Sequence, residues 1–259
     1  YFPSRTKAKR AIMAGEVYVN GELVDKAGTP IQKSDDIEIK GDSLPYVSRG
    51  GLKLEKALQS FSISPNNKEA IDVGASTGGF TDCLLQQGAA RVYAIDVGYG
   101  QLAWKLRQDK RVKVIERTNF RYFTREDLDV VVPLIVIDVS FISLKLIIPQ
   151  ALPFLKKGGE IIALIKPQFE AGRERVGKNG VVREKDIHID VIRELVTFFK
   201  SQNLEVNALD YSPITGASEK NIEFLVYLQK PRDNSKMISQ SLTDDKIERV
   251  VNLAHRDLG

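Results

Sequence analysis

The stretch Asp72-Val73-Gly74-Ala75-Ser76-Thr77-Gly78-Gly79-Phe80 joins an apolar strand pattern to a helix pattern through three glycines. We predict the strand at residues 70–73 and the helix at residues 80–87. Glycines between a strand end and a helix start let the backbone approach a ligand closely, near the positive end of the helix. The turn is therefore a candidate cofactor site, made of Gly74, Ala75, Ser76, Thr77, Gly78, Gly79 and Phe80.

Asp96 follows Gly74 by 22 residues and ends the second predicted strand, residues 91–95. A carboxylate at this point can accept hydrogen bonds from both ribose hydroxyls of an adenosine-type cofactor. The dinucleotide fingerprint has glycine where this chain has Ser76. These features therefore do not distinguish an NAD site from an S-adenosylmethionine site. The alternative is that they bind no cofactor and are only a tight turn and an acidic residue at a strand end.

Strand and helix patterns alternate after residue 49, which indicates a parallel α/β sheet. Helices are predicted at residues 52–60, 80–87, 102–108, 144–155 and 186–201, and strands at residues 70–73, 91–95, 113–115, 134–137, 160–165, 204–209 and 223–228. After Lys230 the sequence turns polar, apart from one amphipathic run at residues 244–254. We interpret this run as a docking helix or a frayed tail.

The composition excludes several classes of protein. The chain has 259 residues, enough for one or two domains, and 42% of them are hydrophobic, which argues against disorder. With one cysteine, Cys83, and two histidines, it can form neither an intrachain disulfide nor a His/Cys zinc site, so we expect no metal. Its longest apolar run, residues 130–139, is shorter than the ~20 residues of a membrane span. No signal peptide is visible, so we expect a cytoplasmic protein without a membrane partner.

Basic residues cluster at the start of the chain, where Arg5, Lys7, Lys9 and Arg10 precede the first acidic residue, Glu16. They lie in a predicted helix, residues 4–14, followed by a predicted hairpin with an Asn20-Gly21 turn. Together with the net charge of +4, the cluster favours a polyanionic partner. A solvated basic helix on a small α+β appendage is the alternative.

Four charged residues fit one patch at the carboxyl ends of the strands. Asp138 and Lys166 each follow a fully apolar strand, where burying a charged side chain that has no function would be unfavourable. Strand ends surround the ligand crevice of a parallel sheet, so both residues should face the cofactor; a structural ion pair is the alternative. Lys53, near the start of a helix, and Glu223, at the start of the last strand, fit the same patch, although either alone is more typical of a solvated surface.

Together, Lys53, Asp138, Lys166 and Glu223 resemble the Lys-Asp-Lys-Glu tetrad of ribose 2′-O-methyltransferases of the FtsJ type. The resemblance is closest to the TlyA family, historically called haemolysins, and covers residues 8–228. Its most specific stretches are Tyr46-Val47-Ser48-Arg49-Gly50-Gly51, Asp138-Val139-Ser140-Phe141-Ile142-Ser143-Leu144, Lys166-Pro167-Gln168-Phe169-Glu170 and residues 177–183. It implies a bacterial, cytoplasmic enzyme that uses S-adenosylmethionine to form 2′-O-methylcytidine in ribosomal RNA.

Residues 8–21 resemble the small RNA-binding domain of ribosomal protein S-four, pseudouridine synthases and tyrosyl-tRNA synthetases, in which the basic helix docks on RNA phosphates. Such domains begin one helix earlier, so we expect the first helix to be missing here. The domains are then residues 1–43 for RNA binding, 44–48 as a linker, 49–230 as a Rossmann-like FtsJ-type methyltransferase, and 231–259 as a polar tail with a short helix.

The residues support ribose methylation independently of the resemblance. Lys166 can orient the attacking hydroxyl or accept its proton, and much of the rate can come from positioning. Base-nitrogen methylation fits less well, because Val139 and Ser140 stand where its Asp/Asn-Pro-Pro-aromatic loop has prolines. Methylation at cytosine carbon 5 needs a cysteine nucleophile, and Cys83 lies within a predicted helix.

Two further contact regions are predicted. Cofactor contacts should also come from Asn119 and Phe120 at the end of the third strand, and from Asp138. RNA contacts should come from Arg49 and from a long basic loop that carries Arg173, Arg175, Lys178 and Arg183, unless this loop is only solvated and mobile. Two other functions stay open, a non-catalytic RNA-binding ribosome-assembly factor and a membrane-active haemolysin, although no amphipathic helix favours the latter.

Overall fold

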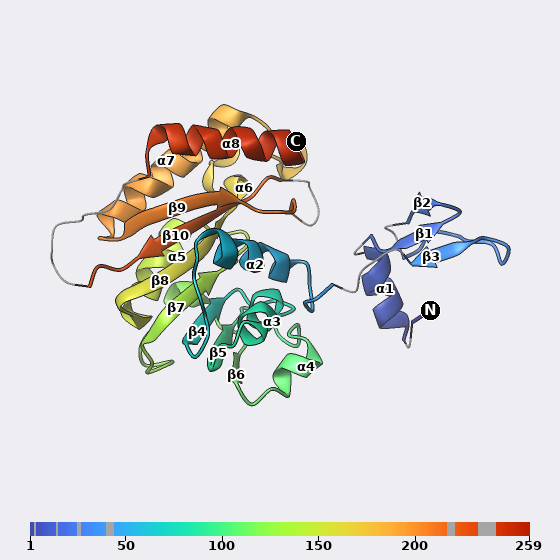
Figure 1. The fold of residues 1–259 in the computed structure, drawn as a ribbon, viewed down its shortest axis with the longest axis horizontal. Helices are drawn as coiled ribbons and strands as arrows, with labels where there is room; N and C mark the ends of the chain where they lie inside the picture. Colours follow the sequence, from blue (N-terminus) through green and yellow to red (C-terminus); the bar gives the residue numbers. More distant parts are fainter. Residues whose placement is uncertain (3, 14, 25–26, 40–43, 217–220, 233–241) are drawn as a thin grey trace. The chain divides into compact units, whose positions relative to one another are not determined.

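The computed structural model of the chain describes residues 1–2, 4–13, 15–24, 27–39, 44–216, 221–232 and 242–259. These residues form two compact units, Tyr1–Pro45 and Tyr46–Gly259 (Figure 1). Among the described residues, no helix is long and apolar enough to cross a membrane.

The first unit packs one helix with a three-stranded antiparallel sheet, of order β2-β1-β3. Its elements are α1 (Arg5–Met13), β1 (Val17–Val19), β2 (Glu22–Leu23) and β3 (Ile37–Ile39). Asn20 and Gly21 have φ angles of 51° and 82°, as a two-residue turn between β1 and β2 requires. The basic helix and the hairpin are therefore present as predicted from the sequence.

The second unit is built on a seven-stranded sheet, of order β6-β5-β4-β7-β8-β10-β9. Strands β4, β5, β6, β7 and β8 pair in parallel, whereas β10 runs antiparallel to both of its neighbours. The strands are β4 (Glu69–Val73), β5 (Arg91–Ile95), β6 (Val112–Ile115), β7 (Val132–Ile137), β8 (Leu155–Ile165), β9 (Glu205–Tyr211) and β10 (Phe224–Gln229). The Rossmann-like sheet predicted from the alternating patterns is confirmed.

Helices cover both faces of this sheet, and each face has its own apolar core (Figure 1). One core contains Leu54, Leu84 and Leu106, from α2 (Gly50–Ser60), α3 (Gly79–Gln86) and α4 (Trp104–Arg107). The other contains Ile147, Leu195 and Val251, from α5 (Leu144–Ala151), α7 (Lys185–Ser201) and α8 (Asp244–Leu258). Both faces of the central strands are thus buried, which explains why these strands are apolar throughout.

The antiparallel direction of β10 follows from its connection to β9. A parallel neighbour would need a crossover, usually a helix. No helix is described between Tyr211 and Phe224, so the chain returns alongside β9 in the opposite direction. This turn brings the residue that precedes β10, Glu223, to the same edge of the sheet as the end of β8.

The amphipathic run near the C-terminus forms α8, four residues longer than the predicted 244–254. Ile247, Val251 and Ala254 are buried in the core that α7 and β9 share. We interpreted this run as either a docking helix or a frayed tail, and the structure shows the docked helix. The predicted helix 144–155 ends earlier, at Ala151, because a short 3-10 turn (Leu152–Phe154) carries Pro153 and leads directly into β8.

Candidate active site

The turn between β4 and α3 wraps closely around neighbouring backbone. The N–H groups of Gly74 and Ala75 both donate to the carbonyl oxygen of Ile95, at 2.9 and 3.1 Å. Gly74 has a φ of 86°, and a Cβ at this position would collide with the carbonyl oxygen of Asp138. Only glycine meets both demands, so the glycine here places the turn directly against the end of β7.

Asp96 lies at the end of β5, beside this turn. Its Oδ2 accepts a hydrogen bond from the N–H of Ser76 at 2.7 Å, and its Oδ1 accepts one from the N–H of Gly98 at 2.6 Å. Each carboxylate oxygen has two lone pairs. The fixed carboxylate therefore keeps acceptor capacity for the hydroxyl groups of a ribose.

Asp72, on β4, is fully buried beneath the turn. Its Oδ2 accepts a hydrogen bond from the Thr81 hydroxyl at 2.6 Å, while its Oδ1 has no partner among the described residues. Burial raises the pKa of Asp72 to about 7, and the nearby charges of Asp138 and Asp96 add to the increase. A buried acceptor without a partner is unfavourable, so this oxygen is suited to a cationic ligand. No role for Asp72 was predicted from the sequence.

The side chains of two predicted cofactor-binding residues, Phe80 and Phe120, point into the protein rather than outwards. The Phe120 ring packs in the core against Phe123 and Phe154, with ring centroids 5.3 and 6.2 Å away. Phe80 is buried in the other core. The Asn119 side chain accepts from the Arg121 N–H at 3.1 Å and caps a short 3-10 turn (Phe120–Tyr122). Phe80 and Phe120 can therefore contribute backbone groups, but not their rings, to a ligand.

The four predicted catalytic residues form two ion pairs. Lys53 Nζ lies 2.5 Å from Glu223 Oε2, and Lys166 Nζ lies 2.7 Å from Asp138 Oδ1. Lys166 also donates a hydrogen bond to the Ser140 hydroxyl at 2.9 Å. Lys53 and Lys166 are each 8% exposed and Glu223 is 2% exposed. Charges so little solvated need partners, and here each lysine has a carboxylate.

Sheet register brings the two pairs next to each other. The last pair of β10 and β8 is Phe224 with Ile165, so the next step places Glu223 opposite Lys166. Ile137, Ile165 and Phe224 all point into the core on the α5, α7 and α8 side. Because side chains alternate along a strand, Asp138, Lys166 and Glu223 point to the other face, which α2 covers. Lys53 reaches them from α2.

An exposed aromatic side chain follows Asp138 closely. Phe141 is 90% exposed and has a φ of 63°, a backbone conformation that residues other than glycine rarely adopt. Its ring centroid lies 4.9 Å from that of Phe169, three residues after Lys166. Neither ring was predicted from the sequence to have a role, although an aromatic residue three positions after each strand-end charge, Asp138 and Lys166, is an available signal.

The predicted RNA-binding residues are distributed over three regions. Arg5 and Lys9 are exposed on α1, and Arg49, at the start of α2, is half-buried; the side chains of Lys7 and Arg10 lie outside the described part. Arg173, Lys178 and Arg183 are exposed in the loop that precedes α7. Arg175 differs from them, because its guanidinium donates to the Ala171 carbonyl oxygen at 2.6 Å and pairs with Glu194 at 3.0 Å. It ties the loop to α7.

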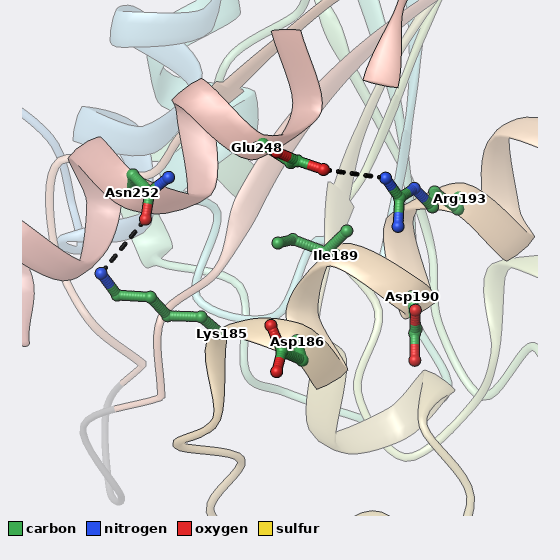
Figure 2. Close-up of a pocket in the computed structure, with 7 residues that line it drawn as sticks. All are labelled: Lys185, Asp186, Ile189, Asp190, Arg193, Glu248 and Asn252. Atoms are coloured by element: carbon green, nitrogen blue, oxygen red, sulfur yellow. Dashed lines mark hydrogen bonds and ion pairs between the residues drawn. The ribbon is translucent and has the colours of Figure 1, made fainter. Parts of the chain in front are cut away.

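A hollow of about 360 Å³ lies between α7 and α8 (Figure 2). Charged and polar side chains line it, and two contacts cross it: Lys185 Nζ donates to Asn252 Oδ1 at 3.1 Å, and Arg193 pairs with Glu248 at 3.0 Å. These contacts fasten α8 to α7, and none of the predicted catalytic residues lines the hollow.

Residues 46–230, which carry the strand-end quartet and the glycine turn, match the FtsJ-like methyltransferase family. The chain belongs to this family. Residues 1–37 match the S4 domain, so this FtsJ-like methyltransferase carries an S4 domain ahead of its sheet.

Relatives share this arrangement over nearly the whole length. YqxC of Bacillus subtilis, provisionally named an rRNA methyltransferase, is 53% identical, covering 98% of this chain and 90% of that protein. The 16S/23S rRNA (cytidine-2'-O)-methyltransferase TlyA of Mycobacterium tuberculosis is 38% identical, covering 96% of this chain and 92% of that protein. A solved structure from Streptococcus thermophilus, provisionally named a hemolysin, is 49% identical, with a TM-score of 0.81 and coverage of 99% and 92%. The predicted resemblance to the TlyA family is confirmed.

Proposed function

We propose that this chain transfers a methyl group from S-adenosylmethionine to a ribose 2′-hydroxyl, that of a cytidine, in ribosomal RNA. The observation that carries the proposal is the quartet of Lys53, Asp138, Lys166 and Glu223, which meets at the strand ends beside the glycine turn. The TlyA relative, whose name specifies a cytidine 2′-O-methyltransferase, supports the choice of nucleoside. Because ribosomal RNA is the substrate, we place the reaction in the cytoplasm.

The residues around the turn fit an S-adenosylmethionine molecule. Asp96 would accept the ribose hydroxyls of the cofactor, and the backbone of the Gly74–Phe80 turn would lie along its methionine part. The unpartnered Oδ1 of Asp72 would face its positive charge. When bound, the cofactor supplies an activated methyl group on a sulfonium.

Within this frame, the quartet acts on the attacking hydroxyl. As the oxygen–methyl bond forms and the sulfur–methyl bond breaks, the hydroxyl proton must leave. Lys166, held by Asp138 and Ser140, orients this hydroxyl. It can also take the proton, but only in its neutral amine form, because the ammonium form has no free lone pair. Lys53 and Glu223 form the second ion pair, next to Lys166 at the strand ends. Positioning of this kind can supply much of the rate.

RNA would be held outside the quartet. Phe141 offers an exposed ring on which the base of the target nucleotide can stack. Arg173, Lys178 and Arg183 would contact phosphates near the site, as would Arg49. We further propose that the S4-type unit, including Arg5 and Lys9 on α1, is a second RNA contact. The residues expected to form a linker, from Tyr46 on, and those expected to form a polar tail belong with the methyltransferase unit, because Tyr46 and one face of α8 are buried in its cores.

Methyl transfer with a matched pair of lysine variants tests this proposal. Purified protein is incubated with ribosomal subunits and methyl-labelled S-adenosylmethionine, and label in the RNA is counted. We expect Lys166→Ala to lower the rate at least about 100-fold, as loss of a proton-transfer or orienting group does. The control is Lys68→Ala, which breaks a comparable ion pair, 2.6 Å from Glu160, at the opposite end of the strands. Near-normal turnover by Lys166→Ala would contradict the assigned role.

A further inference from the structure

Two loops carry Asp138 and Lys166, one of the two ion pairs of the quartet. Residues 138–144 follow β7, and residues 166–170 follow β8, the last four of which form the short helix α6 (Pro167–Glu170). Lys166 holds the two loops together at their strand ends, through Asp138 and Ser140. What holds them at their far ends determines how steadily Asp138 pairs with Lys166 and Phe141 packs against Phe169.

Glu170 makes that second connection. Its Oε1 accepts a hydrogen bond from the N–H of Leu144 at 2.8 Å, and its Oε2 accepts one from the Ser143 hydroxyl at 2.5 Å. Ser143 is the N-cap of α5 and also accepts from the N–H of Lys145 at 3.1 Å. A single carboxylate from α6 thereby fixes the point at which the loop after β7 becomes α5.

The segment between the two connections is under backbone strain. Phe141 has a φ of 63° with its side chain 90% exposed. Such a conformation persists only where the surrounding structure holds it. The Lys166 contacts hold one side of Phe141, and the Glu170 contacts hold the other side, two residues further on.

We propose that Glu170 is a positioning residue for methyl transfer: its two hydrogen bonds keep the loop that carries Asp138 and Phe141 in place against Lys166. This inference rests on the proposed function. Glu170 acts through Ser143 and Leu144, and its contribution depends on its length and on its two hydrogen-bonding positions rather than on its charge. Burial raises the pKa of Glu170 above its ordinary value, which agrees with a role that needs no negative charge.

Three substitutions of Glu170 separate this role from a role of its charge. Glu170→Ala removes both hydrogen bonds, and Glu170→Asp keeps the charge but is one methylene too short to reach both partners. Glu170→Gln keeps the length: its oxygen can accept from Leu144 and its amide can donate to Ser143. We expect single-turnover methylation of ribosomal RNA to fall about tenfold or more in the Ala and Asp variants, because small displacements at a reacting centre slow it strongly. The Gln variant should stay within about threefold of the unaltered protein, and the Kd for S-adenosylmethionine should change less than about threefold in all three.

Glu160→Ala is the matched control. Like Glu170, Glu160 accepts two hydrogen bonds, from Lys68 at 2.6 Å and Tyr227 at 3.2 Å, but it lies midway along β8, away from the loops that carry the quartet. Its loss should lower the Tm without changing the single-turnover rate. Hydrogen exchange adds a readout that needs no activity: peptides that cover residues 138–146 should exchange faster in Glu170→Ala and Glu170→Asp than in Glu160→Ala.

The possible results differ in what they overturn. If the unaltered protein transfers no methyl group to ribosomal RNA, the proposed function fails, and this inference with it. If the unaltered protein is active and Glu170→Ala keeps its rate, only the positioning role fails, even if exchange of residues 138–146 increases. A slow Gln variant beside a fast Asp variant would also overturn it, since the charge would then be what matters. If Glu170→Ala does not fold, the comparison of Gln with Asp still decides the question.

Discussion

At the scale of single residues, Asp72 is the group whose environment changes its chemistry most. It lies in an apolar strand, has one hydrogen-bond donor, Thr81, and lies near the carboxylates of Asp138 and Asp96. Its pKa of about 7 lies above the ordinary value of 3.8, so the folded state binds this proton more tightly than the unfolded state does. The stability that depends on Asp72 is therefore greatest below about pH 4, falls as the pH rises to about 7, and stays constant above.

We predict that Asp72→Asn flattens this dependence. The amide is neutral at every pH, and its oxygen can still accept from Thr81. The free energy of unfolding, measured by urea titration from pH 5 to pH 8, should fall less in the variant than in the unaltered protein. Parallel curves for the two proteins would mean that Asp72 does not titrate in this range.

Residue-level prediction from sequence succeeded where a local pattern carried the information. Asp138 and Lys166 stand out because each follows a run of apolar residues, and the structure pairs them. Asp72, Phe141 and Glu170 received no role, because their importance depends on neighbours that are distant in sequence. Arg175 was predicted to contact RNA, and the local pattern could not show its pairing because its partner, Glu194, lies on α7, 19 residues further along the chain.

At the scale of elements, the turn between β4 and α3 depends on Gly74. A non-glycine residue at a φ of 86° costs about 1–2 kcal/mol, and a Cβ here also collides with the carbonyl oxygen of Asp138. We predict that Gly74→Ala lowers the Tm and abolishes S-adenosylmethionine binding in calorimetry. In the control, Gly21→Ala, the φ of 82° is similar but no atom lies within 4 Å of the new Cβ; equal cofactor affinity in the two variants would contradict the steric argument.

The loop before α7 is the second element whose role can be measured. We predict that replacing Arg173, Lys178 and Arg183 together by Ala lowers the salt dependence of RNA binding, reducing the slope of log K against log salt by about 2. Arg175→Ala is the control, because its guanidinium is already paired with Glu194 and bonded to Ala171. An unchanged slope in the triple variant would show that the loop does not contact phosphates.

The strands and helices were predicted well wherever the apolar pattern was long. The alternating pattern predicts a parallel sheet, whereas β10 runs antiparallel to β8 and β9; the signal for this reversal is the lack of a helix pattern between residues 209 and 223. The end of the predicted helix 144–155 was wrong by four residues, because apolar residues continue through the 3-10 turn into β8. Periodicity identifies apolar elements but does not mark the point where a buried helix gives way to a buried strand.

At the scale of the whole molecule, two units with different tasks are joined in one chain. The unit Tyr1–Pro45 carries exposed Arg5 and Lys9 on its helix. The unit Tyr46–Gly259 carries the glycine turn, the quartet and the basic loop. Phosphate contacts supply affinity without selecting a sequence, so the choice of the methylated atom must come from the second unit, at the carboxyl ends of its strands.

Nucleoside mass spectrometry measures most directly which atom of the RNA is methylated. Ribosomal subunits are incubated with the purified protein and S-adenosylmethionine that carries a heavy methyl group, and the RNA is digested to nucleosides. The account predicts the heavy methyl group on the ribose of cytidine, as 2′-O-methylcytidine, and its absence when Lys166→Ala replaces the unaltered protein. A heavy methyl group on a base, or equal ribose methylation by the Lys166→Ala variant, would contradict the central claim.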